Sequence, residues 1–186
     1  MSDGLLHSTA QLAQAVFGAR AASILLHDDS AGELWFAAVS GVGADVVTGL
    51  RIPDSTGVAG WVLSARQPIV LEDVASDPRY AAEMAALSGY QPKGLMAAPL
   101  LADERSLGVL EVLDRPQRAQ FSLVELDLLG LLAQQAAIAV GLEQDAGHPR
   151  GQIPAVIGQL WDTLDRLDPE RRERAESLLD ALAQLL

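Results

Sequence analysis

The chain has 186 residues, 49% hydrophobic and 20% charged, which is enough for one domain with a full core plus an appendage. It contains no cysteine, which excludes disulfides, thiolate metal sites and cysteine nucleophiles. A net charge of −12 provides no basic surface for a phosphate backbone, so we expect no nucleic-acid binding. Apolar runs are too short to span a membrane and the N-terminus lacks a basic signal-peptide start, so we expect a cytoplasmic protein without a membrane partner.

The first third of the chain predicts a helix followed by a β-hairpin. Apolar residues at helical spacing predict a helix over residues 5–17, which ends at Gly18. Two apolar runs, at 22–27 and 33–40, are separated by turn residues and predict two paired strands. Gly41-x-Gly43 and Gly57-x-x-Gly60 match no phosphate-binding loop, and we interpret them as turn and close-packing glycines.

The middle of the chain predicts short elements. Cap-type residues precede the sequence GVAGWVLSAR at 57–66, which predicts a short helix with a strand at 68–71 after it. Asp77-Pro78 has the pattern of a helix start, and this helix would carry Tyr80, Met84 and Leu87 at helical spacing.

Residues 93–116 predict a second hairpin, near the middle of the sheet. Apolar runs at 95–101 and 107–113 flank a charged turn. Alternation along the second run places Glu111 on one face with Leu107, Val109 and Leu113. Burying an unpaired charge is costly, so we expect Glu111 to contact a ligand or a water-filled cavity, or to pair with Lys93 or Arg115.

From Ser122 a capping box with Glu125 begins a helix that runs to about residue 144. Its apolar residues spread around most of the circumference, which predicts burial on several sides. We therefore expect a domain over residues 1–145, a linker at 146–152, and a tail at 153–186. The tail has a heptad pattern typical of a helical hairpin or an interrupted coiled coil, which could contact a protein partner.

This order of elements predicts an α+β sandwich around an antiparallel sheet. Three stretches resemble GAF domains: RIPDSTGVAGWVLSARQPIVLEDV, KGLMAAPLLADERSLGVLEVLDRP and FSLVELDLLGLLAQQAAIAV. The resemblance covers about residues 5–143. It implies a sheet of five to six strands with the terminal helices on one face, and a pocket under short helices and loops on the other. It also implies a small-molecule sensing and dimerisation module.

In cyclic-nucleotide-binding members, the resemblance implies that Glu111 takes the position of a carboxylate that contacts the purine. Their Asn-Lys…Phe-x-x-x-Asp-Glu motif is here Asp114-Arg115…Phe121…Glu125-Leu126, and only Phe121 is retained, which argues against cyclic-nucleotide binding. The bilin-binding and sulfoxide-reducing members depend on cysteine, which this chain lacks.

The residues that we expect to bind a ligand surround the predicted pocket, and each has a simpler structural role as its alternative. Tyr80 and Tyr90 suit a pocket wall, or a simple core or surface position. Ser40 ends a strand where the family's pocket begins or forms a turn, and Asp73 either reaches the ligand or caps its loop. The candidates are Glu111, Tyr80, Tyr90, Ser40, Asp73 and Lys93.

We expect no metal site, no cofactor and no catalytic residue. His27 has no second ligand at metal spacing, and Trp61 is interpreted as a core residue. The leading hypothesis is a stand-alone GAF-type sensor that binds a small molecule, forms a homodimer through its terminal helices and signals through its tail. The alternatives are a dimerisation scaffold with an occluded, vestigial pocket and, less well supported because no nucleophile–base pair is present, an enzyme.

Overall fold

A computed structural model describes residues 2–82, 86, 88–102, 105–116 and 123–146 of the chain. The chain divides into two compact units, Met1–Asp145 and Ala146–Leu186, and the description concerns the first. The linker predicted at 146–152 lies outside the described residues except for Ala146, and the predicted tail at 153–186 lies wholly outside them.

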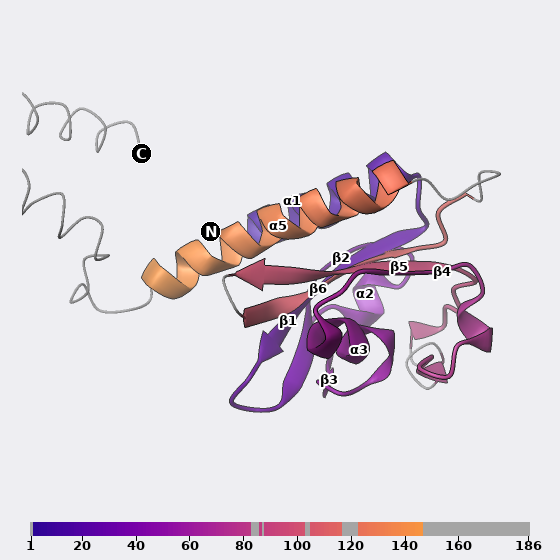
Figure 1. Cartoon of the computed structure of the whole chain (residues 1–186), viewed down its shortest axis with the longest axis horizontal. Helices are drawn as coiled ribbons and strands as arrows, with labels where there is room; N and C mark the ends of the chain where they lie inside the picture. Colours follow the sequence, from indigo (N-terminus) through magenta and orange to yellow (C-terminus); the bar gives the residue numbers. More distant parts are fainter. Residues whose placement is uncertain (1, 83–85, 87, 103–104, 117–122, 147–186) are drawn as a thin grey trace, which may run out of the picture. The chain divides into compact units, whose positions relative to one another are not determined.

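The centre of the domain is a six-stranded antiparallel sheet (Figure 1). Its order is β3-β2-β1-β6-β5-β4, so both predicted hairpins are confirmed and the β1–β6 pair joins them at the middle. Glu111 therefore lies on a central strand. The strands are β1 (Ala21–Asp28), β2 (Glu33–Gly41), β3 (Arg51–Pro53), β4 (Ile69–Leu71), β5 (Leu95–Ala102) and β6 (Arg105–Leu113).

The two long helices, α1 (Ser2–Phe17) and α5 (Leu123–Ala146), cover one face of the sheet (Figure 1). Each buries one stripe of residues three and four apart, as an amphipathic helix does on a core. The stripes comprise Leu6, Ala10, Ala13 and Phe17 of α1, and Leu129, Leu132, Ala133, Ala136, Ala137 and Val140 of α5. They form one apolar cluster with sheet residues that include Ile24, Leu110 and Val112. We call this side of the sheet the helix face.

The opposite side, which we call the cavity face, has a second and separate apolar cluster. Helix α3 (Gly57–Ala65) packs here on β5 and β6, and α2 (Ala44–Val47) and the 3-10 turn η1 (Val74–Ser76) complete the layer. A Cβ atom on Gly60 would lie 2.5 Å from the Asp54 carbonyl oxygen, so α3 sits against the preceding loop only because residue 60 is glycine. The prediction of a close-packing glycine is confirmed at this position.

The predicted helix start at Asp77 is wrong. The Asp77 carboxylate accepts hydrogen bonds from the Arg79 backbone N–H at 2.9 Å and from its guanidinium, with Nε at 2.8 Å, so it closes a turn. These bonds to Arg79 hold the pKa of Asp77 at about 2. Residue 82 is the first helical residue after this turn, so Tyr80 precedes the helix, and Met84 and Leu87 lie outside the described residues.

Leu107 also differs from its predicted place. The β5–β6 register moves from Leu100↔Gly108 to Leu101↔Ser106, which leaves Leu107 as the extra residue of a β-bulge. A bulge reverses the alternation of side chains, and Leu107 accordingly joins the apolar cluster of the helix face. Val109 packs in the cluster of the cavity face, and Leu113 packs against it, as predicted.

Candidate ligand-binding site

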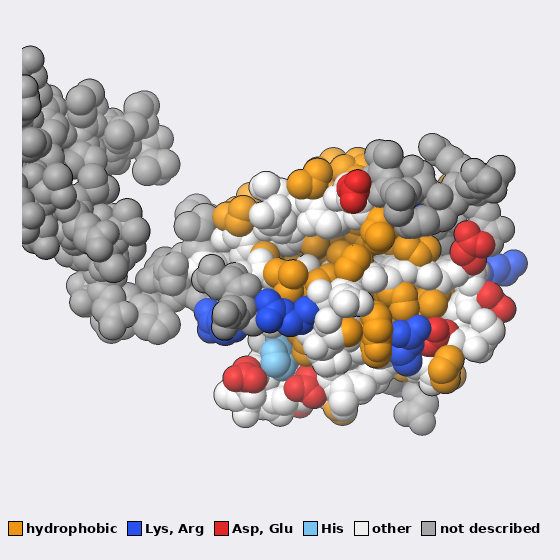
Figure 2. All heavy atoms as spheres, in the orientation of Figure 1, with side chains coloured by type: hydrophobic (Ala, Val, Ile, Leu, Met, Phe, Trp, Pro, Cys, Tyr) orange, Lys and Arg blue, Asp and Glu red, His pale blue; other side chains and the backbone are white. Residues whose placement is uncertain are grey.

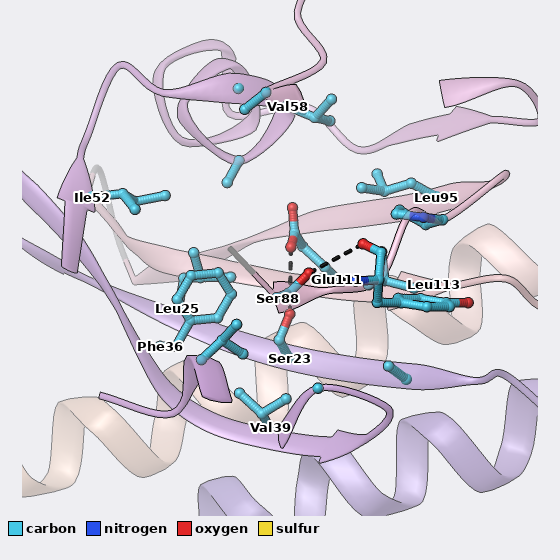
Figure 3. Close-up of a pocket in the computed structure, with 18 of the residues that line it drawn as sticks. Ser23, Leu25, Phe36, Val39, Ile52, Val58, Ser88, Leu95, Glu111 and Leu113 are labelled. Atoms are coloured by element: carbon cyan, nitrogen blue, oxygen red, sulfur yellow. Dashed lines mark hydrogen bonds between the residues drawn. The ribbon is translucent and has the colours of Figure 1, made fainter. Parts of the chain in front are cut away.

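A cavity of about 130 Å³ lies on the cavity face, between the sheet and the layer that contains α2 and α3 (Figure 3). A single water needs roughly 10–15 Å³ by the same measure of space, so the cavity could hold several waters or a small molecule. Most of its wall is apolar, with Leu25, Phe36, Ile52 and Val58 among the contributors. Polar groups are few, and they include the hydroxyls of Ser23, Thr56, Ser88 and Tyr90.

Glu111 is the charged residue of this wall. It is 8% exposed, and the β1–β6 register places Ser23 directly opposite it. The Ser23 hydroxyl donates to Glu111 Oε2 across 3.4 Å, which is at the long limit for a hydrogen bond between oxygens. Figure 3 shows this bond, with the carboxyl group of Glu111 pointing from the sheet into the space below α3.

Burial raises the pKa of Glu111 to about 7, and the bond from Ser23 opposes the shift only in part. Near neutral pH the group therefore exists in both forms, so it can accept a hydrogen bond from a ligand or donate one. Perturbed carboxyls of this kind are a recurrent feature of functional sites, although structural pairs also produce them.

The predicted pairing of Glu111 with Lys93 or Arg115 is wrong. The Lys93 side chain is exposed, and its backbone N–H donates to Asp114 at 2.7 Å. The Arg115 guanidinium lies 3.6 Å from Glu125 of α5. Among the described residues, the Glu111 carboxyl group accepts its hydrogen bond from the neutral hydroxyl of Ser23. No cation in this part of the chain therefore neutralises the Glu111 carboxylate.

The structure brings three of the six candidate residues together, because Glu111, Tyr80 and Tyr90 all line the cavity. Lys93 lies outside it, in a neighbouring cleft. Asp73 is exposed at the start of η1 and does not line this cavity.

Ser40 lies on the helix face, where its hydroxyl donates to Gln14 Oε1 at 2.5 Å. The register of β1 and β2 moves from Ile24↔Ala38 to Leu25↔Phe36, so Ala37 is an extra residue in β2. This bulge reverses the alternation, which turns Val39 toward the cavity and Ser40 away from it.

Three hydroxyl-bearing residues that line the cavity were not among the candidates, namely Ser23, Thr56 and Ser88. Ser23 is the one polar residue in the apolar run at 21–26 of β1, and this pattern, combined with the strand register, could have identified it. Ser88 is itself a helical residue, just before the turn at Gly89, and lines the cavity from there (Figure 3). Its hydroxyl donates to the Tyr90 carbonyl oxygen at 3.1 Å. No sequence pattern marks Ser88, because its place depends on how this segment folds over the sheet.

The other candidates for chemistry have structural partners. His27 Nε2 lies 3.2 Å from Asp54, and the described part of the chain contains no group of three or more His, Asp or Glu side chains placed to hold a metal. Trp61 packs against the apolar cluster of the cavity face, as predicted, and the Arg79 guanidinium lies 4.5 Å from its ring centre.

Comparison with known proteins agrees with this fold. A family model described as GAF domain matches residues 3–140. The chain belongs to the GAF family. Among curated proteins it is 24% identical, over 131 residues, to the dual 3',5'-cyclic-AMP and -GMP phosphodiesterase 11 of Drosophila melanogaster. That match covers 70% of this chain but only 9% of the phosphodiesterase.

Solved structures with the same fold include GAF domains of several kinds of protein. The GAF domain of a phosphoenolpyruvate-protein phosphotransferase from Coxiella burnetii has a TM-score of 0.71 at 24% identity, over 78% of this chain and 86% of that one. The free methionine-R-sulfoxide reductase of Neisseria meningitidis, solved with its substrate, has a TM-score of 0.64 at 25% identity, over 78% and 81%. The second GAF domain of DevS from Mycobacterium smegmatis has a TM-score of 0.62 at 22% identity, over 78% and 97%. GAF domains are in general small-molecule sensory or regulatory modules.

Among the helices of the described residues, none combines the length and the apolar character that crossing a membrane would require.

Proposed function

We propose that this chain is a sensory module that binds a small molecule in the cavity beside Glu111. The observation that carries the proposal is a carboxyl group that is 8% exposed, has one long hydrogen bond to Ser23, and borders unfilled space. A ligand that donates a hydrogen bond would supply the partner that the protein does not provide. A scaffold with a vestigial pocket would be expected to fill this space with side chains, so the cavity favours the sensor.

A thermal-shift screen of metabolites and nucleotides tests the proposal, because a ligand that binds only the folded state raises the melting temperature by mass action. We expect a stabilising compound for the wild type and a much smaller shift for Glu111→Gln. Ser40→Ala is the matched control, since it removes a buried polar group of the helix face and should keep the full response. Equal shifts in wild type and Glu111→Gln would remove Glu111 from the site.

The proposed role is not enzymatic. The structural relative from Neisseria meningitidis is a free methionine-R-sulfoxide reductase, but this chain has no cysteine that could act as a nucleophile or reductant. Incubating the chain with free methionine sulfoxide and a thiol reductant should give no reduction above the rate of the reductant alone. Turnover that Glu111→Gln abolishes would contradict this expectation.

We further propose that the chain forms a homodimer through the outer sides of α1 and α5. Leu5, Leu12 and Val16 of α1 are 57, 51 and 47% exposed, and Leu131 and Ile138 of α5 are 59 and 51% exposed. Hydrophobic side chains gather over this edge of the domain (Figure 2). Exposed apolar side chains that cluster in this way are typical of a surface that another protein covers.

The mass of the full chain in solution tests the dimer. We expect a dimer at micromolar concentration and a monomer for Leu12→Glu with Leu131→Glu, since two charges would lie in the interface. A wild-type monomer would contradict the proposal. A signal could then pass from the dimer to a partner protein through residues 153–186, which stays a prediction.

A further inference from the structure

Tyr90 lines the Glu111 cavity and also a second hollow, a cleft of the same domain. The cleft has a volume of about 350 Å³ and lies beside β4, β5 and the residues that precede β5. Tyr90 and Leu95 line both the cavity and the cleft. Leu95 is paired with Leu113 of β6 in the sheet, whereas Tyr90 lies in a loop. Of the two residues that border both hollows, Tyr90 is therefore the one that can move without breaking the sheet.

The Tyr90 side chain is held in place by two contacts. Its hydroxyl donates to Asp114, and the Arg20 guanidinium lies 5.4 Å from its ring centre. Burial and the bond to Asp114 raise the pKa of Tyr90 to about 12, so the hydroxyl keeps its proton at neutral pH. The closed position of the ring therefore depends on one hydrogen bond and one cation–π contact, each of which can be removed by mutation.

Asp114 is itself fixed by the backbone. Its other carboxylate oxygen accepts the N–H groups of Lys93 at 2.7 Å and Gly94 at 2.8 Å, and its own N–H donates to the Gly94 carbonyl oxygen at 3.0 Å. Its φ of 51° is in the left-handed region, which aspartate tolerates better than most residues. A rigid acceptor at the end of β6 thus defines where the Tyr90 hydroxyl can dock.

The rim of the cleft carries charges of both signs, although the chain as a whole has a net charge of −12. Arg20, Lys93 and Arg115 line it, together with the carboxylates of Glu72 and Asp114. Asp114 uses its oxygens on Tyr90 and on backbone N–H groups, and Arg115 lies near Glu125. Arg20 and Lys93 are exposed, as is Glu72, so both cations are within reach of an anionic group that enters the cleft. Guanidinium and ammonium groups form charge-assisted hydrogen bonds with carboxylate and phosphate oxygens.

We propose that this cleft is the entrance to the Glu111 cavity, that Tyr90 opens and closes it, and that the ligands it admits carry a carboxylate or phosphate group that pairs with Arg20 and Lys93. The apolar part of such a ligand would occupy the cavity, and a neutral polar group would reach Glu111 and Ser23. The ligand preference rests on the proposed function, whereas the entrance itself is a property of the protein alone.

The absence of cysteine allows a direct test, because Ser23→Cys creates a single thiol inside the cavity at a side chain that is 4% exposed. Two methanethiosulfonate reagents of similar size, one with a sulfonate and one with a trimethylammonium group, are reacted with the folded full chain, and mass spectrometry follows each rate. The same protein unfolded in urea gives the intrinsic ratio of the two rates. A cooperative thermal melt confirms that each variant is folded.

We expect the anionic reagent to be favoured at least threefold over its intrinsic ratio, and this preference to disappear in Arg20→Gln with Lys93→Gln. Tyr90→Phe and Tyr90→Ala should speed both reagents, by about tenfold in Tyr90→Ala. Tyr80→Phe is the matched control, because Tyr80 lines the cavity but not the cleft, and its rates should equal those of Ser23→Cys alone.

Rates that do not change in either Tyr90 variant, or no labelling of the folded protein in any variant, would overturn the entrance. A preference that survives loss of Arg20 and Lys93 would overturn the anion selectivity. The result is independent of the thermal-shift screen, since labelling reports the path to the introduced thiol whether or not a natural ligand is found. A screen without a stabilising compound would therefore remove the proposed function and leave the entrance standing.

Discussion

On the helix face of the sheet, the Ser40 hydroxyl donates to Gln14 of α1 across 2.5 Å, and its neighbourhood is closed by the packed stripes of α1 and α5. On the cavity face, Glu111 has a 3.4 Å contact with Ser23 and borders about 130 Å³ of space. Both residues are nearly buried, yet only one has a short hydrogen bond to a neighbouring element. Buried polar groups usually have close hydrogen-bond partners, and the weaker partner of Glu111 is the reason for proposing a ligand there.

The largest expected effect is a difference in packing between the two faces, measured as the stability lost when a leucine of each face is truncated. Leu100→Ala on the helix face should lower the free energy of unfolding by about 4 kcal/mol, because its neighbours are packed on all sides. Leu95→Ala on the same strand should cost only about 2 kcal/mol, because Leu95 already borders the cavity. Urea denaturation of both variants at pH 7 measures the difference. Equal losses would show that the cavity face is packed as tightly as the helix face.

The next effect concerns pH. The pKa of Glu111 is raised from 4.5 to about 7, so between these values the folded state binds more protons than the unfolded state. Its contribution to stability is therefore most favourable below pH 4.5, decreases as the pH rises, and is constant above pH 7. The total loss is about 3 kcal/mol, since one pKa unit corresponds to about 1.36 kcal/mol.

Glu111→Gln isolates this term, because it removes the titration and keeps the shape of the side chain. The free energy of unfolding of the variant, minus that of the wild type, should rise by about 3 kcal/mol between pH 4.5 and pH 7. Urea denaturation across this range measures it. A difference that is independent of pH would mean that Glu111 titrates in the folded protein as it does in the unfolded chain.

Smaller effects are expected from the two serines. Ser40→Ala should cost about 1 kcal/mol with no change between pH 4.5 and pH 7, since it leaves Gln14 without its donor. Ser23→Ala should raise the pKa of Glu111 further, because the bond from Ser23 lowers it. An NMR titration of the Glu111 carboxyl carbon would detect this shift. A downward shift would contradict the assigned role of Ser23.

The sequence predicts the sheet and the position of Glu111 well, because both follow from the alternation of side chains in regular strands. It misplaces Ser40, which follows a bulge in β2, and Leu107, which is the extra residue of a bulge in β6. A single extra residue reverses the alternation of side chains between the two faces. The bond between Tyr90 and Asp114 joins residues 24 positions apart in a loop and at a strand end. No local pattern specifies such a contact, so the entrance could be recognised only in the folded protein.

The measurement that tests the central claim most directly is a calorimetric titration of the best compound from the thermal-shift screen. The compound should bind Glu111→Gln at least tenfold more weakly than the wild type at pH 7, since a hydrogen bond to a charged group contributes about 1.5–3 kcal/mol. Its affinity for Ser40→Ala should stay within twofold of the wild type. Equal affinity for wild type and Glu111→Gln would contradict the assignment of this cavity as the ligand site.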